Sequence, residues 1–188
     1  MIIINSTIPS DFEPNSGTSN YLRLLQGKHR IRILSGAVAG YVWWTDSEDG
    51  GRKPHRIPMD GKPPVEFAES LRRFIAFPIW NYELNRVQIW EITQNSIQKE
   101  LKAYEADKDW GSLLEYDLEI ERTGNDKLNT RYRVSPKPKA PLDKDIESKI
   151  EGLPVMDALY DGSDPFTAAV DENGKYIKEE VEPESLPF

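Results

Sequence analysis

The sequence predicts a mainly β protein with one long helix, and three observations lead to this fold class. Runs rich in Val, Ile, Trp, Tyr and Phe recur between residues 28 and 135, and Gly, Pro, Asn or Asp separates them, which is typical of strands joined by turns. One segment among these runs repeats its apolar residues at i, i+4 and i+7, the period of a helix face. The length of 188 residues is enough for one domain with an appendage.

The first predicted strand is long and bent. Residues 1–20 contain many turn formers and few apolar anchors, so we expect a flexible lead-in there. The strand starts in KHRIRIL at 28–34, where isoleucines alternate with arginines as in a strand with one buried and one basic face. SGAVAG interrupts it, and YVWWT returns to β-forming residues, so 28–34 and 38–45 are interpreted as halves of one strand. The polar, Gly- and Pro-rich segment at 46–64 is predicted to be a loop.

A hairpin and the helix follow this loop. The hairpin joins strands at 71–80 and 86–93, in which aromatic and β-branched residues alternate. The helix is predicted at 94–106, because Ile97, Leu101 and Tyr104 recur at helical spacing. Either of two hydroxyl residues is expected to cap its N-terminus, namely Thr93 or Ser96.

The last two strands complete a known order of elements. Strands at 114–122 and 128–135 flank a Gly-Asn-Asp turn and form a second hairpin. Three strands, a helix and two strands are the order of the OB fold, a five-stranded Greek-key barrel. We therefore predict an OB domain at 21–140 with extra hairpin and loop elaborations. A linker with short helical turns is expected at 141–160, and an acidic tail at 161–188, disordered or conditionally ordered.

Charge is distributed very unevenly along the chain. The net charge is −8, yet residues 1–140 carry 20 Lys and Arg against 19 Asp and Glu. Residues 141–188 carry 4 against 13, so the acidity belongs to the C-terminal part. Such asymmetry indicates a nucleic-acid-binding body or a charged interaction tail.

Several classes of protein are disfavoured by what the sequence lacks. It has no Cys and two His, which removes disulfides and thiolate zinc sites and leaves little for imidazole chemistry, so we expect no metal and no cofactor. No apolar run approaches the ~20 residues of a membrane span, and the first residues lack a signal-peptide pattern, so a cytoplasmic protein that contacts no membrane is expected. Phosphate-loop, nucleophile-elbow and His-Glu-x-x-His motifs are absent. The remaining enzymatic alternative is a metal-dependent nuclease that uses Asp46, Glu48 and Asp49.

Basic and aromatic residues are interleaved along the predicted strands, which is what binding to single-stranded nucleic acid requires: cations for phosphates and flat rings for bases. Trp43 and Trp44 must point to opposite faces of a strand, and Trp44 is favoured as the base contact. Phe77 and Trp90 are expected in the core, and His29 and His55 are assigned no role. The candidate nucleic-acid contacts are Arg30, Arg32, Trp43, Trp44, Arg52, Lys53, Arg56, Arg72, Arg73, Phe74, Trp80, Tyr82, Arg131, Tyr132 and Arg133.

A longer stretch resembles a known family. FIAFPIWNYELNRVQIWEITQNSIQKE, the following DWGSLLEYDLEIERTG and the closing YRVSPKP resemble bacteriophage single-stranded DNA-binding proteins over residues 21–142, most specifically at 74–136. The resemblance implies an OB fold that coats DNA strands during phage replication. In some relatives a Cys/His zinc site stabilises the fold, and this chain has no Cys with which to build one.

The C-terminus resembles a second pattern. Bacterial single-stranded DNA-binding proteins end in an acidic run, an aliphatic residue, Pro and Phe, and recruit replication and repair proteins through this tip. The resemblance implies partner-binding roles for Glu182, Glu184, Leu186, Pro187 and Phe188. A carboxylate on a terminal aromatic residue suits a basic rim around an apolar pocket.

These observations predict a sequence-nonspecific single-stranded DNA-binding protein, without catalysis, that protects DNA strands during replication, recombination or repair and recruits partners through its tip. The alternative is a protein–protein adaptor, or an acidic DNA mimic, built on an OB barrel. Whether the protein forms a homo-oligomer or assembles cooperatively on DNA is left open by the sequence.

Overall fold

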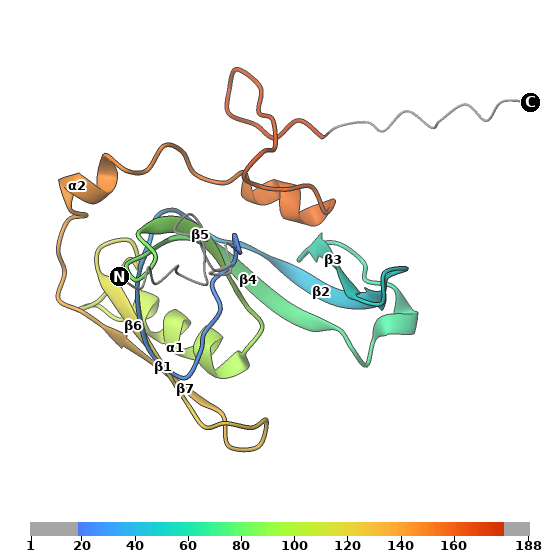
Figure 1. Ribbon diagram of the computed structural model, residues 1–188, viewed down its shortest axis with the longest axis horizontal. Helices are drawn as coiled ribbons and strands as arrows, with labels where there is room; N and C mark the ends of the chain where they lie inside the picture. The colour runs from blue at the N-terminus through green and yellow to red at the C-terminus, as the bar shows by residue number, and fades with distance from the viewer. Residues whose placement is uncertain (1–18, 179–188) are drawn as a thin grey trace, which may run out of the picture.

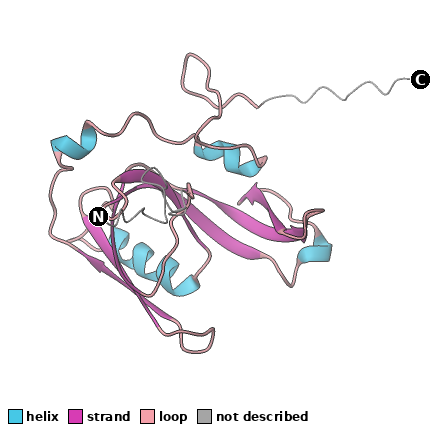
Figure 2. Ribbon diagram, viewed as in Figure 1, coloured by secondary structure: helices cyan, strands magenta, loops and turns pink. Residues whose placement is uncertain are grey.

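A computed structural model describes residues 19–178 of the chain, and in this range the secondary structure is mainly β, as predicted (Figure 1, Figure 2). The strands are β1 (Gly27–Ile33), β2 (Val38–Asp46), β3 (Arg52–Pro58), β4 (Arg72–Asn81), β5 (Arg86–Ile92), β6 (Asp117–Thr123) and β7 (Arg131–Pro136). The helical elements are α1 (Asn95–Ala106), α2 (Lys144–Glu147) and the 3₁₀ turns η1 (Val65–Phe67) and η2 (Met156–Tyr160). Within residues 19–178, no helix combines the length and the apolar character that a membrane crossing requires.

The strands form one open antiparallel sheet with β4 at its centre. The order is β3-β2-β4-β1-β6-β7, and β5 pairs with β4. Along its other edge β4 pairs first with β2, over Arg72–Ala76, and then with β1, over Ile79–Asn81. β1 and β2 therefore follow one another along the same edge of β4, as expected for two halves of one bent strand.

β3 stands where the sequence predicts a loop. It pairs with β2 over seven residue pairs, so the prediction of a loop throughout 46–64 is wrong. Pro54 and Pro58 make this segment look like a loop in the sequence, because proline cannot donate a backbone hydrogen bond and is found in strands mainly at an edge such as β3. The two strands approach closely at Gly40, where a Cβ atom would overlap the carbonyl oxygen of Ile57. β2 and β3 together form a hairpin that extends away from α1 and β6 (Figure 1).

α1 begins one residue later than predicted and without the predicted cap. Its N-cap position is Gln94, whose side chain makes no capping hydrogen bond, so the assignment of Thr93 or Ser96 as the cap is wrong. The predicted apolar face is confirmed, since Ile97 and Leu101 are both buried.

Two apolar clusters lie on opposite faces of β4. The first lies between the sheet and α1 and contains Phe77 and Trp90, so the prediction that both residues are in the core is confirmed. The second lies on the outward face of β2, β4 and β5, where Phe74 is covered by Met156 and Leu159 of η2. The outward face of β4 is thus closed by a segment more than 70 residues further along the chain.

Order continues beyond the boundary that the sequence suggests at residue 161. Residues 162–178, predicted to be disordered or conditionally ordered, form turns and an isolated bridge between Val170 and Tyr176. Phe166 packs against the second apolar cluster, and the amide of Val155 donates to the carbonyl of Pro165 over 2.7 Å. A few apolar anchors in an acidic segment are enough to dock it onto an apolar sheet face.

Candidate nucleic-acid interface

Five of the predicted DNA contacts are buried and are not available to a ligand in this structure. Arg32, Trp43, Arg56, Phe74 and Trp80 are each exposed by 9% or less. Strand alternation predicts which residues share a face, but it does not reveal that η2 covers one face of β4. In this structure these five side chains offer little surface for the direct contact that the sequence predicts.

The alternating arginines of β1 converge on one buried carboxylate. Arg30 Nη2 lies 2.6 Å from Asp117 Oδ2, and Arg32 Nη1 lies 3.2 Å from Asp117 Oδ1. The Tyr82 hydroxyl donates to the same Oδ1 over 2.9 Å, and the Arg30 guanidinium lies 4.9 Å from the centre of the Tyr82 ring. Arg32 also donates to two backbone carbonyls, each at 2.8 Å. This cluster connects β1 to β6 and to Tyr82, which directly follows β4, so its role is structural.

The outward face of β1, β6 and β7 is mixed in charge rather than basic. Glu119 lies between Lys28, at 3.1 Å, and Lys137, at 3.0 Å. Hydrogen bonds from Lys137 and Lys28 hold the pKa of Glu119 below its usual value. Arg133 faces Glu121 across the β6–β7 pair. Carboxylates therefore balance most cations of this face.

The three candidates on β7 lie far from the β2–β3 hairpin in the sheet. β7 and β3 are the two ends of the strand order. Arg131 is exposed and donates to the carbonyls of Leu128 and Thr130, whereas Tyr132 packs partly against the first apolar cluster. The structure therefore does not join Arg131, Tyr132 and Arg133 to the cations of the hairpin.

Two tyrosines, Tyr82 of the Asp117 cluster and Tyr116, make the free energy of unfolding depend on pH in the alkaline range. Burial and the hydrogen bond to Asp117 raise the pKa of Tyr82 to about 12, and burial raises the pKa of Tyr116 to about 12, from an unfolded value of 10.0. A raised pKa means that the folded state holds the proton more tightly, so this stabilisation is complete below pH 10 and is lost as the pH rises towards 12. Urea unfolding between pH 9 and pH 11.5 should show this loss. Tyr82→Phe and Tyr116→Phe should each have a flatter pH dependence than the native protein, and equally steep profiles would contradict the assignment.

Exposed cations gather around the β2–β3 hairpin and the start of β4. Arg52, Lys53, Arg72 and Arg73 are all exposed, and no carboxylate of residues 19–178 forms an ion pair with any of them. Trp44 is partly buried, and the Arg52 guanidinium lies 5.8 Å from the centre of its ring. Arg52 and Arg72 leave the paired strands on the face of Trp44, and Lys53 and Arg73 leave them on the opposite face, so unpaired cations lie on both sides of this part of the sheet.

The turn of this hairpin carries carboxylates. Asp46, Glu48 and Asp49 are exposed around the tip. The Asp49 carboxylate accepts a hydrogen bond from the Ser47 hydroxyl, which is the main reason that its pKa lies below its usual value. In the part of the chain that the structure describes, no three potential metal ligands come together, at this turn or elsewhere.

The hairpin also contains a ring stack that the sequence did not reveal. Trp43, the buried member of the Trp43–Trp44 pair, lies between the rings of His55 and Phe67. These rings come from β2, β3 and η1, and η1 lies between the predicted loop at 46–64 and the predicted strand at 71–80, in residues to which no element was assigned. The only sequence signal was the position of His55 two residues from Lys53, which places both on one side of a strand.

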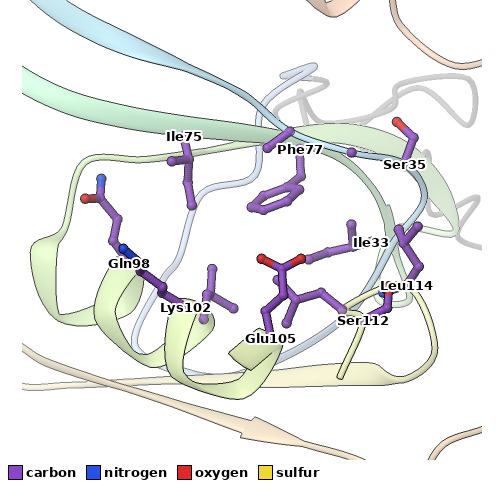
Figure 3. Close-up of a pocket in the computed structure, with 13 residues that line it drawn as sticks. Ile33, Ser35, Ile75, Phe77, Gln98, Lys102, Glu105, Ser112 and Leu114 are labelled. Atoms are coloured by element: carbon purple, nitrogen blue, oxygen red, sulfur yellow. The ribbon is translucent and has the colours of Figure 1, made fainter. Parts of the chain in front are cut away.

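A pocket of about 470 Å³ lies elsewhere, between α1 and the bend that joins β1 to β2 (Figure 3). Ile33, Ile75 and Phe77 form part of its apolar wall, and Lys102 and Glu105 of α1 lie at its edge. None of the predicted DNA contacts lines it.

The predicted partner-binding residues Glu182, Glu184, Leu186, Pro187 and Phe188 lie outside the described residues, as does most of the predicted lead-in at 1–20. Comparison with protein-family models, with curated proteins and with solved structures finds no match.

Proposed function

We propose that this chain is a non-catalytic, sequence-nonspecific single-stranded DNA-binding protein, and that DNA lies along the β2–β3 hairpin and the start of β4. One observation carries the proposal: four cations are exposed on adjacent strands, Arg52 and Arg72 on the face of Trp44 and Lys53 and Arg73 on the face of His55, and none forms an ion pair with a carboxylate of residues 19–178. Phosphates suit these cations, and base faces suit the ring. Partner recruitment through Glu182, Glu184 and Leu186–Phe188 belongs to the same proposal.

The order of elements supports this reading of the hairpin. If β1 and β2 are counted as one bent strand, the chain runs through that strand, β4, β5, α1, β6 and β7, which is the OB order with a helix between the third and fourth strands. β3 is then an insertion in the loop between the first two OB strands. That loop is one of the regions with which OB domains bind oligonucleotides. If the domain is an OB fold, the exposed cations of the hairpin correspond to a region with which such domains bind their ligand, and this supports the proposal.

A salt titration with a single-stranded oligonucleotide tests the proposal. The full chain should bind fluorescein-labelled oligo-dT, and the logarithm of the association constant should fall with the logarithm of salt concentration. For single-stranded DNA, each phosphate contact contributes about −0.7 to the slope of this plot, so four contacts give a slope of about −3. The matched control is the same label on duplex DNA, which hides its base faces and should bind more weakly.

Each other result points to a different function. Absence of salt-sensitive binding would overturn the proposal and favour an adaptor or an acidic DNA mimic. Shortening of the oligonucleotide when Mg²⁺ is added would overturn it in favour of a nuclease.

A further inference from the structure

Three rings form a continuous stack across the β2–β3 hairpin. The centres of Trp43 and His55 are 5.5 Å apart with an angle of 18° between the ring planes, and those of Trp43 and Phe67 are 6.0 Å apart with an angle of 23°. The rings are nearly parallel, an arrangement that adds to stability beyond the burial of area. Since they come from β2, β3 and η1, the fold rather than local sequence aligns them.

The stack has one end that can accept another ring. Trp43 stacks with both His55 and Phe67 and is 8% exposed, so it does not stack on a ligand itself. His55 lies on β3, the last strand at its end of the sheet, and is only partly buried. Within residues 19–178 no further ring stacks on its other face.

The His55 ring is held in place before any ligand arrives. Its Nε2 lies 2.8 Å from Thr45 Oγ1, which fixes the rotation of the ring, and Trp43 supports one of its faces. A ring ordered in this way loses little conformational entropy when a ligand binds.

A free cation stands beside this ring. Lys53 precedes His55 by two residues on β3, so both side chains leave the strand on the same side. Lys53 is exposed and pairs with no carboxylate in the part of the chain that the structure describes. A flat face with an adjacent cation matches a nucleobase with its phosphate.

We propose that the outer face of the His55 imidazole is a stacking site for one base of single-stranded DNA, with Lys53 beside the phosphate of that nucleotide. This inference rests on the proposed function and adds a base-binding residue to it. The site takes any base, because every base offers a π face.

Substitution of His55 in the full chain tests the site. His55→Ala removes the ring and should weaken oligo-dT binding by about 5- to 150-fold, the range that single base–aromatic stacks contribute. His55→Phe keeps a flat ring and should bind within about threefold of the native protein. Quenching of tryptophan emission by oligo-dT should follow the same order, because Trp43 contacts the substituted ring. Near-ultraviolet circular dichroism reports whether the Trp43 environment survives each change.

The outcomes separate this inference from the proposed function. If the native protein binds oligo-dT and His55→Ala binds equally well, the stacking site is wrong while the function stands. If His55→Phe loses as much affinity as His55→Ala with its near-ultraviolet spectrum intact, the ring face is not the contact, and the inference is overturned. If the native protein does not bind oligo-dT, the proposed function itself fails.

Discussion

Replacement of Asp117 by Asn is expected to lower the free energy of unfolding by about 3–5 kcal/mol, the cost of leaving a buried charge without its partner. Asp117 and Arg32 have side chains that are 8% and 6% exposed, so water does not replace the lost carboxylate charge. The asparagine side chain keeps the shape of the site but not its negative charge, and the Arg32 guanidinium stays buried with only dipoles as partners. Urea unfolding at neutral pH measures the loss.

Glu119→Gln is the matched control for this change. Glu119 lies on the same strand and also contacts two cations, but Lys28 and Lys137 are partly or largely exposed. Exposed ion pairs contribute about 0–1 kcal/mol, so this variant should unfold close to the native midpoint. A loss for Asp117→Asn no larger than that for Glu119→Gln would show that the cluster around Asp117 is not a structural centre.

Removal of the four exposed cations of β3 and β4 is expected to abolish most of the proposed affinity for single-stranded DNA. The variant carries Arg52→Ala, Lys53→Ala, Arg72→Ala and Arg73→Ala, and all four side chains are exposed, so the fold should persist. If each contacts one phosphate, the slope of the salt dependence should flatten by about 3, and affinity at 0.1 M salt should fall by about 10²–10³-fold. Anisotropy titrations with labelled oligo-dT measure both quantities.

The control removes the same amount of charge from the opposite end of the sheet. It carries Lys28→Ala, Arg131→Ala, Arg133→Ala and Lys137→Ala, so its net charge equals that of the hairpin variant. Glu119 and Glu121 already balance much of this face, and the change should weaken binding by less than about fivefold. An equal loss in both variants would show that net charge, not the hairpin, governs binding. A larger loss in the control would place the interface on β7.

The elements that the sequence predicts correctly are those whose spacing of apolar residues matches the face that the fold buries. β4, β5, α1, β6 and β7 follow from alternation or helical spacing, because each has one face in the first apolar cluster. β3 was missed because its two prolines and three basic residues resemble a loop, and only its pairing with β2 makes it a strand. That pairing is not a local property of the sequence.

The candidate site was predictable in its residue types but not in its location. Arg30 and Arg32 were correctly placed on one face of a strand, yet the carboxylate that neutralises them, Asp117, is more than 80 residues away in sequence. Phe74 was predicted to be accessible because nothing in the pattern of β4 shows that η2 packs on its outward face. Assigning a role to His55 requires the ring stack, which three separate elements create.

The edge strand β3 also bears on how copies of this protein can associate. The free backbone groups of an unpaired edge strand can pair with a strand of a neighbouring molecule, and repeated pairing of this kind would join many copies into one extended sheet. Pro54 and Pro58 have no amide proton to offer an incoming strand, and the positive charges of Arg52 and Lys53 repel the same edge of a second copy. Copies of the protein are therefore expected to associate through surfaces other than this edge, which would leave the hairpin free for the nucleic acid that we propose it binds.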